Sequence, residues 1–193
     1  MSSIQRLTTP FAQADTRRDF LHQSGLLLSG TAIALLTGRK ALAAAGEGSP
    51  ENDVRALNTA LGAEYEAIAA YQVGAQSGLL KKPILDVAVT FQGHHKEHAN
   101  VLSQTIAKLG GKPVSAKEKY TFPTDSLKTQ NDVLRFAASL EKGAVSAYLG
   151  AVPIFHDRDL AKAAASILGD EAMHWAVLRH VLGETPVPSA FVS

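Results

Sequence analysis

Four segments of the chain carry apolar residues at alternating steps of three and four, the spacing that buries one face of an α-helix. They run over about residues 50–77, 83–109, 130–152 and 158–183. Helix signals mark their ends, because Ser49-Pro50 suits the start of the first segment and Gly110-Gly111-Lys112-Pro113 suits the end of the second. The pattern therefore predicts four amphipathic helices.

The lengths of the connections predict how these helices are arranged. A connection of about five residues joins the first two helices, which is short enough to require an antiparallel hairpin. Residues 110–129 lack sustained periodicity and contain two prolines, so we expect a long crossover there. The expected fold is all-α: an antiparallel four-helix bundle of two helical hairpins joined by this crossover.

The two hairpins also repeat each other in sequence, at a shift of 77 positions for the first helix and 76 for the second. The matched pairs include Glu64 and Glu141, Tyr71 and Tyr148, His98 and His174, and Leu102 and Leu178. Hairpins packed about a pseudo-twofold axis place such pairs opposite one another at the bundle centre. Each tyrosine follows its glutamate by seven residues, two turns along one face, so we expect its hydroxyl to bond a buried carboxylate.

Acidic and imidazole side chains interrupt the apolar stripes at positions that should converge inside the bundle. These positions are Glu64, His95, His98, Glu141, Glu171 and His174. Three carboxylates in one core indicate bound cations, because an isolated buried carboxylate is strongly unfavourable. Mixed oxygen and imidazole ligands suit iron, manganese or zinc, and the chain has no cysteine for a sulfur-based site. We expect one or two ions at this centre.

This arrangement resembles the ferritin-like dinuclear carboxylate proteins, in which two helices each supply a Glu and two each supply Glu-x-x-His. Glu171-Ala172-Met173-His174 matches the Glu-x-x-His element, and Glu64 and Glu141 match the single-Glu elements. The resemblance covers about residues 50–183 and is closest to exported bacterial ferritin-like proteins related to plant desiccation-related proteins. It implies a ferritin-like bundle with metal ligands at Glu64, His95, His98, Glu141, Glu171 and His174.

One position departs from this ligand pattern, because His95 stands where a bridging Glu is expected. A neutral imidazole does not bridge two metals as a carboxylate does. The substitution favours an asymmetric pair or a single ion over a symmetric, oxygen-activating di-iron centre. His94 and Glu97, at the edge of the stripe, are alternative ligands. Glu66 and Asp170 lie off the stripe, and the pattern assigns them no function.

The first 45 residues have the features of an export signal. Residues 16–21 (TRRDFL) resemble the twin-arginine motif, and residues 25–38 are apolar but shorter than the roughly 18 residues of a spanning helix. Residues 41–43 (ALA) have the small-x-small form of a cleavage site. We expect a signal peptide over residues 1–45, a ferritin-like domain over residues 46–193, and a periplasmic or otherwise exported protein. Arg39 and Lys40 keep an uncleaved membrane anchor open as the alternative.

The net charge of the mature chain argues against nucleic acid as a partner. Loss of residues 1–45 leaves 14 basic against 16 acidic residues, which offers no basic surface for nucleic acid. We expect no stable membrane span in the mature form. Metal ions are the expected partners, and a homo-oligomer stays open because a single sequence does not define oligomeric state.

Two functional hypotheses follow from the sequence. The first is an exported metal-binding protein with an Fe or Mn site, or Zn, that oxidises Fe(II) or consumes peroxide. The second is a non-enzymatic bundle associated with stress or desiccation, without metal turnover. The sequence does not decide whether the protein is an enzyme.

Overall fold

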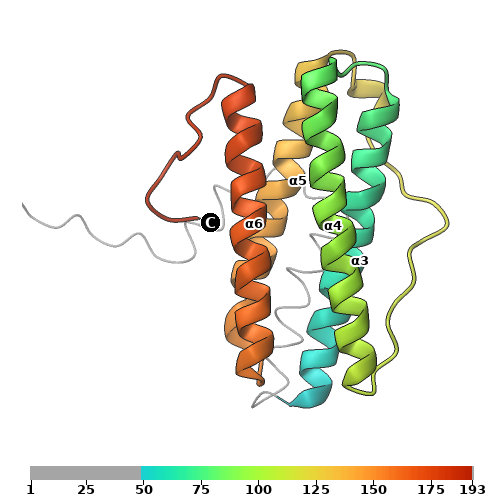
Figure 1. Cartoon of the computed structure of the whole chain (residues 1–193), viewed down its shortest axis with the longest axis vertical. Coiled ribbons are helices and arrows are strands. Elements are labelled where there is room, and N and C mark those ends of the chain that lie inside the picture. The colour runs from blue at the N-terminus through green and yellow to red at the C-terminus, as the bar shows by residue number, and fades with distance from the viewer. Residues whose placement is uncertain (1–48, 193) are drawn as a thin grey trace, which may run out of the picture.

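The computed structural model describes residues 49–192, so the predicted signal at residues 1–45 lies outside the described residues. Four long helices lie side by side along the longest axis in Figure 1: α3 (Pro50–Gln76), α4 (Lys82–Lys108), α5 (Gln130–Ala151) and α6 (Arg158–Val181). Two short 3₁₀ helices, η1 (Thr124–Ser126) and η2 (Val152–Ile154), lie in the connections. The described residues form no strand, and the expected all-α, antiparallel four-helix bundle is confirmed.

Local sequence signals fix the helix ends. The Ser49 hydroxyl accepts a hydrogen bond from the Asn52 backbone N–H, which caps α3. Thr129 and Asp132 form a reciprocal capping box at the start of α5. Gly110 follows α4 with a φ of 77°, a left-handed conformation that favours glycine. Each signal satisfies backbone groups that the helix itself leaves unpaired.

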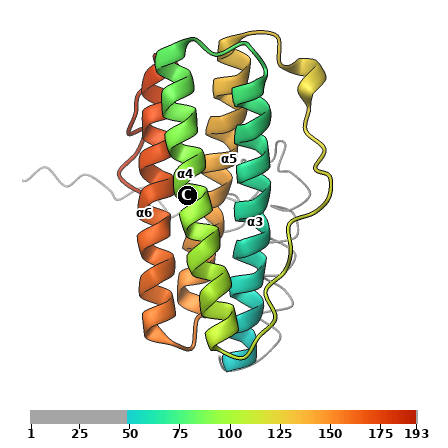
Figure 2. The same cartoon turned by 45° about the vertical axis from the view of Figure 1, so that its right-hand side comes forward.

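The helices pack as two hairpins, α3 with α4 and α5 with α6. The crossover, residues 109–129, runs along the outside of α3 from one end of the bundle to the other, as Figure 2 shows. The buried Asp53 carboxylate in α3 accepts hydrogen bonds from the backbone N–H groups of His156 (2.8 Å) and Asp157 (3.0 Å). These bonds tie the start of the first hairpin to the turn of the second.

Two apolar clusters form the core, with a polar layer between them. One cluster surrounds Leu61 and Ile106, which are both completely buried. The other surrounds Tyr71, Phe91 and Leu134. The polar layer contains buried acids and imidazoles, and apolar packing at both ends holds these side chains in place. They are Glu64, His95, Glu141, Glu171 and His174. Within residues 49–192, no helix is both long and apolar enough to cross a membrane.

Candidate metal centre

All four helices contribute to a buried cluster of acids and imidazoles at mid-bundle. Glu64 comes from α3, Glu141 from α5, the His95 and His98 pair from α4, and the Glu171 and His174 pair from α6. Five of the six are at most 3% exposed, and the side chain of His98 is 15% exposed. Spacing of three within each pair stacks the two side chains one turn apart on the inner face.

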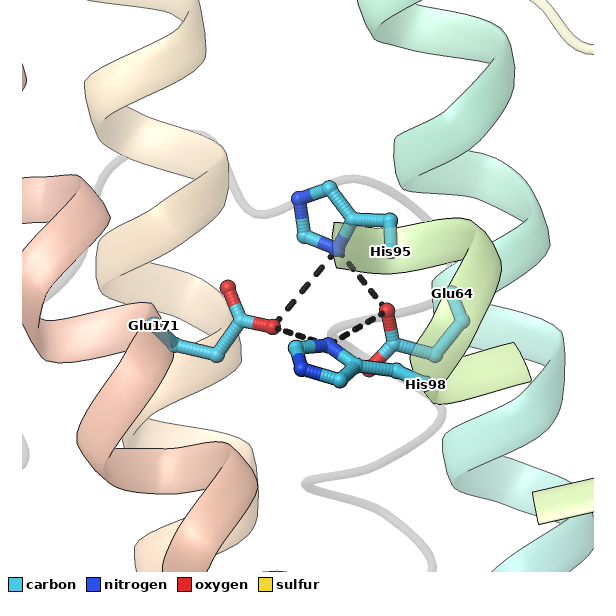
Figure 3. Close-up of side chains that lie close together, drawn as sticks. All are labelled: Glu64, His95, His98 and Glu171. Carbon is cyan, nitrogen blue, oxygen red and sulfur yellow. Dashed lines mark hydrogen bonds and ion pairs between the residues drawn. The ribbon is translucent and has the colours of Figure 1, made fainter. Parts of the chain in front are cut away.

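The first half of the cluster lies between α3, α4 and α6. Figure 3 shows Glu64, His95, His98 and Glu171 pointing toward one another. His95 Nδ1 lies 2.8 Å from Glu64 Oε2, and His98 Nδ1 lies 3.1 Å from Glu171 Oε1. Four ligand atoms, one from each residue, lie within 4.8 Å of one another, a separation small enough for one ion to contact all four.

The second half of the cluster uses His95, Glu141, Glu171 and His174, whose ligand atoms also lie within 4.8 Å of one another. His174 Nδ1 lies 3.5 Å from Glu141 Oε1 and 3.4 Å from Glu171 Oε2. Two residues belong to both halves. Glu171 directs Oε1 to the first half and Oε2 to the second, whereas His95 directs Nδ1 to Glu64 and Nε2 to Glu141. The arrangement therefore offers two adjacent and unequal positions.

Several inward-facing atoms of this cluster have no hydrogen-bond partner among residues 49–192. They are His98 Nδ1, Glu141 Oε2, both carboxylate oxygens of Glu171, and His174 Nδ1. The short His98 to Glu171 separation lacks the geometry of a hydrogen bond, so both atoms remain unsatisfied. Each buried, unsatisfied polar atom costs about 1–3 kcal/mol, and more where it is charged. Nitrogen and oxygen atoms left in this way fit the ligand set of a cation.

Two tyrosines hold the carboxylates that face them across the bundle. The Tyr148 hydroxyl donates to Glu64 Oε1 at 2.5 Å, and the Tyr71 hydroxyl donates to Glu141 Oε1. Burial, together with these carboxylates, raises the pKa of both tyrosines, so they stay protonated as donors. The hydrogen bond expected between each tyrosine and a buried carboxylate is present, with each tyrosine bonded to the glutamate of the other hairpin.

The histidines of the cluster bind protons more tightly than free histidine. Burial by itself would lower the pKa of His95, but hydrogen bonds to Glu141 and Glu64 outweigh burial and raise this pKa to about 11. Neighbouring carboxylates likewise overcome burial and raise the pKa of His98 and of His174 to about 9. Burial would raise the pKa of Glu64, yet its hydrogen bond with His95 and the nearby His98 ring lower it. A cation bound here would compete with these protons.

Asp170 and His94 lie at the outer edge of the cluster, where Asp170 contacts its histidines although it lies off the apolar stripe. Asp170 Oδ2 lies 3.1 Å from His94 Nδ1, 3.2 Å from His174 Nε2 and 3.4 Å from His98 Nε2. His94 Nδ1 also lies 2.9 Å from His174 Nε2. His98 and His174 thus direct Nδ1 inward and Nε2 toward Asp170, while Glu97 is exposed.

The sequence did contain a signal for this outer pair. His94 and Asp170 are 76 positions apart, the same shift that relates the two Glu- and His-bearing helices. Each directly precedes a residue of the cluster. The stripe was too narrow a criterion, because a side chain one position from the inner face can reach a neighbouring helix when the interior is wide. The other off-stripe acid, Glu66, is also buried.

The fold and site define a class: a four-helix bundle in which every helix directs a glutamate, a histidine or both to the centre. The sequence pattern of the ferritin-like domain family matches residues 52–184, and the chain belongs to this family. No curated protein sequence matches the chain.

Two solved structures share the fold. A conserved hypothetical protein from Mycobacterium tuberculosis is 22% identical, with a TM-score of 0.64 over 74% of this chain and 99% of that one. Ferritin-like, diiron-carboxylate proteins from Bacillus anthracis str. Ames give 18% identity and a TM-score of 0.59 over 80% and 99% of the respective chains. At these identities the likeness supports the fold alone.

Proposed function

We propose that this protein binds one or two transition-metal ions of the Fe or Mn type in the bundle core, with Zn as the alternative metal. The ligands would be Glu64, His95, His98, Glu141, Glu171 and His174. The observation that carries the proposal is the set of buried nitrogen and oxygen atoms of this cluster that lack hydrogen-bond partners. Binding a cation would satisfy all of them together.

The proposed activity is oxidation of Fe(II) or reduction of peroxide. A bound redox-active metal supplies electron transfer and Lewis acidity for such reactions. The surrounding residues orient the ligands, because Tyr148 donates to Glu64 Oε1 and Tyr71 donates to Glu141 Oε1. Glu141 Oε2 is left without a hydrogen-bond partner within residues 49–192, whereas Glu64 Oε2 lies 2.8 Å from His95 Nδ1. The two apolar clusters limit the access of bulk water from the two ends of the bundle.

Unequal ligand halves support an asymmetric pair or a single ion rather than a symmetric pair. Glu171 offers one oxygen to each half, as a bridging carboxylate does. The residue opposite it in the repeat is His95, whose neutral ring binds a metal through one nitrogen only. The two positions therefore differ in charge and in ligand type.

The decisive experiment measures metal content together with helicity. Glu141→Ala and His174→Ala should each lower the metal content per chain while the circular dichroism spectrum stays helical, because each removes a buried ligand. Glu97→Ala changes an exposed acid of α4 and is the matched control, with unchanged metal content expected. Unchanged stoichiometry in both ligand variants would remove these residues from the site and overturn the proposal.

A second candidate is a metal-free bundle associated with stress or desiccation. It is favoured by the bonds that the cluster already makes within itself, namely those of Tyr148 and His95 to Glu64 and of Tyr71 to Glu141. A stable natural preparation with less than about 0.2 equivalents of any transition metal, and no binding on titration, would favour it. Iron-dependent oxygen consumption would count against it.

We also propose that the protein acts outside the cytoplasm. Arg17 and Arg18, the apolar residues 25–38 and the small residues at 41–43 support this proposal. N-terminal sequencing of protein from the periplasm should find a mature end after Ala43 or Ala45. Retention of the full chain in the cytoplasm would contradict the proposal.

A further inference from the structure

A large cavity lies between α3 and α5, on the side of the bundle that the crossover covers. Its volume is about 690 Å³. Residues 121–123, 126 and 127 of the crossover line it together with the two helices. Pockets for organic ligands usually measure about 300–1,000 Å³, so the space suits a small organic molecule.

Small apolar side chains create this space. The wall contains Ala60, Ala63 and Ala67 of α3 and Ala144, Ala147 and Ala151 of α5. Larger side chains at these positions would fill the space between the two helices. Phe122 and Phe136 add aromatic surface to the same cavity. These side chains offer no hydrogen bonds to water, so an apolar molecule suits them better than ordered solvent does.

The inner end of the cavity reaches the metal centre. Glu64, His95, Glu141 and Tyr148 all line it. Glu141 is 1% exposed, and its Oε2 has no hydrogen-bond partner within residues 49–192. At the outer end the lining residues include exposed Ser126, which places the mouth beside the crossover. A molecule that enters there can extend from the surface to the acidic and imidazole cluster.

Charge on the wall narrows the class of ligand further. Glu66 lines the cavity and is 8% exposed, and it lies outside the proposed ligand set. A buried carboxylate on the wall disfavours an anionic ligand, because like charges repel strongly where water is scarce. Arg135 also lines the cavity, but its side chain is 62% exposed and its Nη1 lies 2.9 Å from Glu184 Oε1, so it provides little counter-charge for a buried anion.

We propose that this cavity binds an elongated, uncharged and mainly apolar organic molecule, with its inner end against Glu141 and His95. Binding of the apolar body does not depend on a metal. The further statement that the inner end lies beside a metal ion rests on the proposed function.

The experiment uses two probes with the same ring skeleton. N-phenyl-1-naphthylamine is uncharged, and 8-anilinonaphthalene-1-sulfonate carries a negative charge. The uncharged probe should bind the purified protein at one saturable fluorescent site per chain. The anionic probe should bind at least about tenfold more weakly because of the carboxylates on the wall. Equal affinity for the two probes would overturn the charge argument.

Variants that fill the cavity test where the probe binds. Ala63→Phe and Ala147→Phe, one on each wall, should each weaken binding of N-phenyl-1-naphthylamine by about tenfold or more, because the ring occupies the binding volume. Ala163→Phe places the same side chain on an exposed position of α6 and should leave binding unchanged. Circular dichroism should show equal helicity in all three variants.

The outcomes separate this inference from the metal proposal. Broadening of the probe's proton resonances by Mn²⁺, but not by Zn²⁺, would place its inner end beside the metal. The protein could bind the probe, lose that binding in Ala147→Phe, and take up no metal. This result would support ligand binding in the cavity and contradict the proposed function. Equal probe binding by every variant would overturn the inference. So would a dimer that binds no probe and dissociates on Ala147→Phe, because a second copy would then cover this face.

Discussion

At the scale of single residues, the positions of the histidine ring nitrogens determine which atoms face the proposed metal position and which face Asp170. His98 and His174 present Nδ1 to the inner carboxylates and Nε2 to Asp170. A carboxylate behind a metal-binding imidazole fixes both the orientation and the tautomer of the ring. Asp170 lies behind rings on two different helices, so we expect it to be a positioning residue for both halves of the cluster.

Asp170→Asn should therefore weaken metal binding without removing a proposed ligand. We expect the affinity to fall by about 10–100-fold, the usual effect of losing such a partner, with near-normal stoichiometry at saturating metal. Competition with a chromophoric chelator measures this affinity. Glu97→Gln, an exposed acid on α4, is the control and should behave as wild type. Equal affinity in Asp170→Asn and wild type would show that Asp170 does not orient the rings.

The residues of the centre were largely predictable, and those around it were not. Glu64, Glu141 and the paired residues of α4 and α6 could be chosen from the sequence, because charged groups on an apolar stripe stand out and the repeat matches them. The structure brings these residues together, and their role as metal ligands stays a prediction. Asp170 was missed because periodicity reports which face a residue occupies. It does not report how far that side chain reaches across a wide interior.

At the scale of helices, the sequence predicted where helices begin and end. It did not predict how far apart the helices lie. Ser49-Pro50 and Gly110-Gly111 predicted the ends of α3 and α4 to within a residue or so. The separation of α3 from α5 was not predictable, because alanine fits an apolar stripe whether helices pack closely or leave a cavity. Residues 121–127 cover that cavity. Their position could not be predicted either, because they have no periodic pattern of apolar residues.

Two glycine substitutions should have opposite effects on stability. Gly110 has a positive φ after α4, so Gly110→Ala should destabilise the protein by about 1–2 kcal/mol. Gly62 is in the middle of α3, and a Cβ added there would meet nothing within 4 Å. Gly62→Ala should stabilise the protein by about 0.5–1 kcal/mol, since alanine favours the helix. Urea unfolding followed by circular dichroism measures both values, and a change of the same sign in both variants would contradict this account of the two glycines.

At the scale of the whole molecule, the buried cluster links folding to protons and to metal. In the metal-free protein the pKa values of His95, His98 and His174 are raised above the ordinary value of 6.5. A group that binds its proton more tightly when folded stabilises the fold below its unfolded pKa. This contribution is lost as the pH rises through the folded pKa values. The lowered pKa of Glu64 acts in the opposite direction, and its contribution is lost as the pH falls below 4.5.

The metal-free protein should therefore be most stable between about pH 4.5 and 6.5 and lose stability as the pH rises through about 9 toward 11. Metal binds the deprotonated rings, so metal should raise the melting temperature more at pH 9 than at pH 6.5. Thermal unfolding of metal-free and metal-loaded protein across this range measures both effects. His180→Ala, an exposed histidine of α6, should keep the wild-type profile, whereas His174→Ala should flatten it. A metal-free melting temperature that stays constant from pH 6.5 to 9 would show that the cluster does not hold these protons. Any effect of metal on stability would then not come from displacing protons from these histidines.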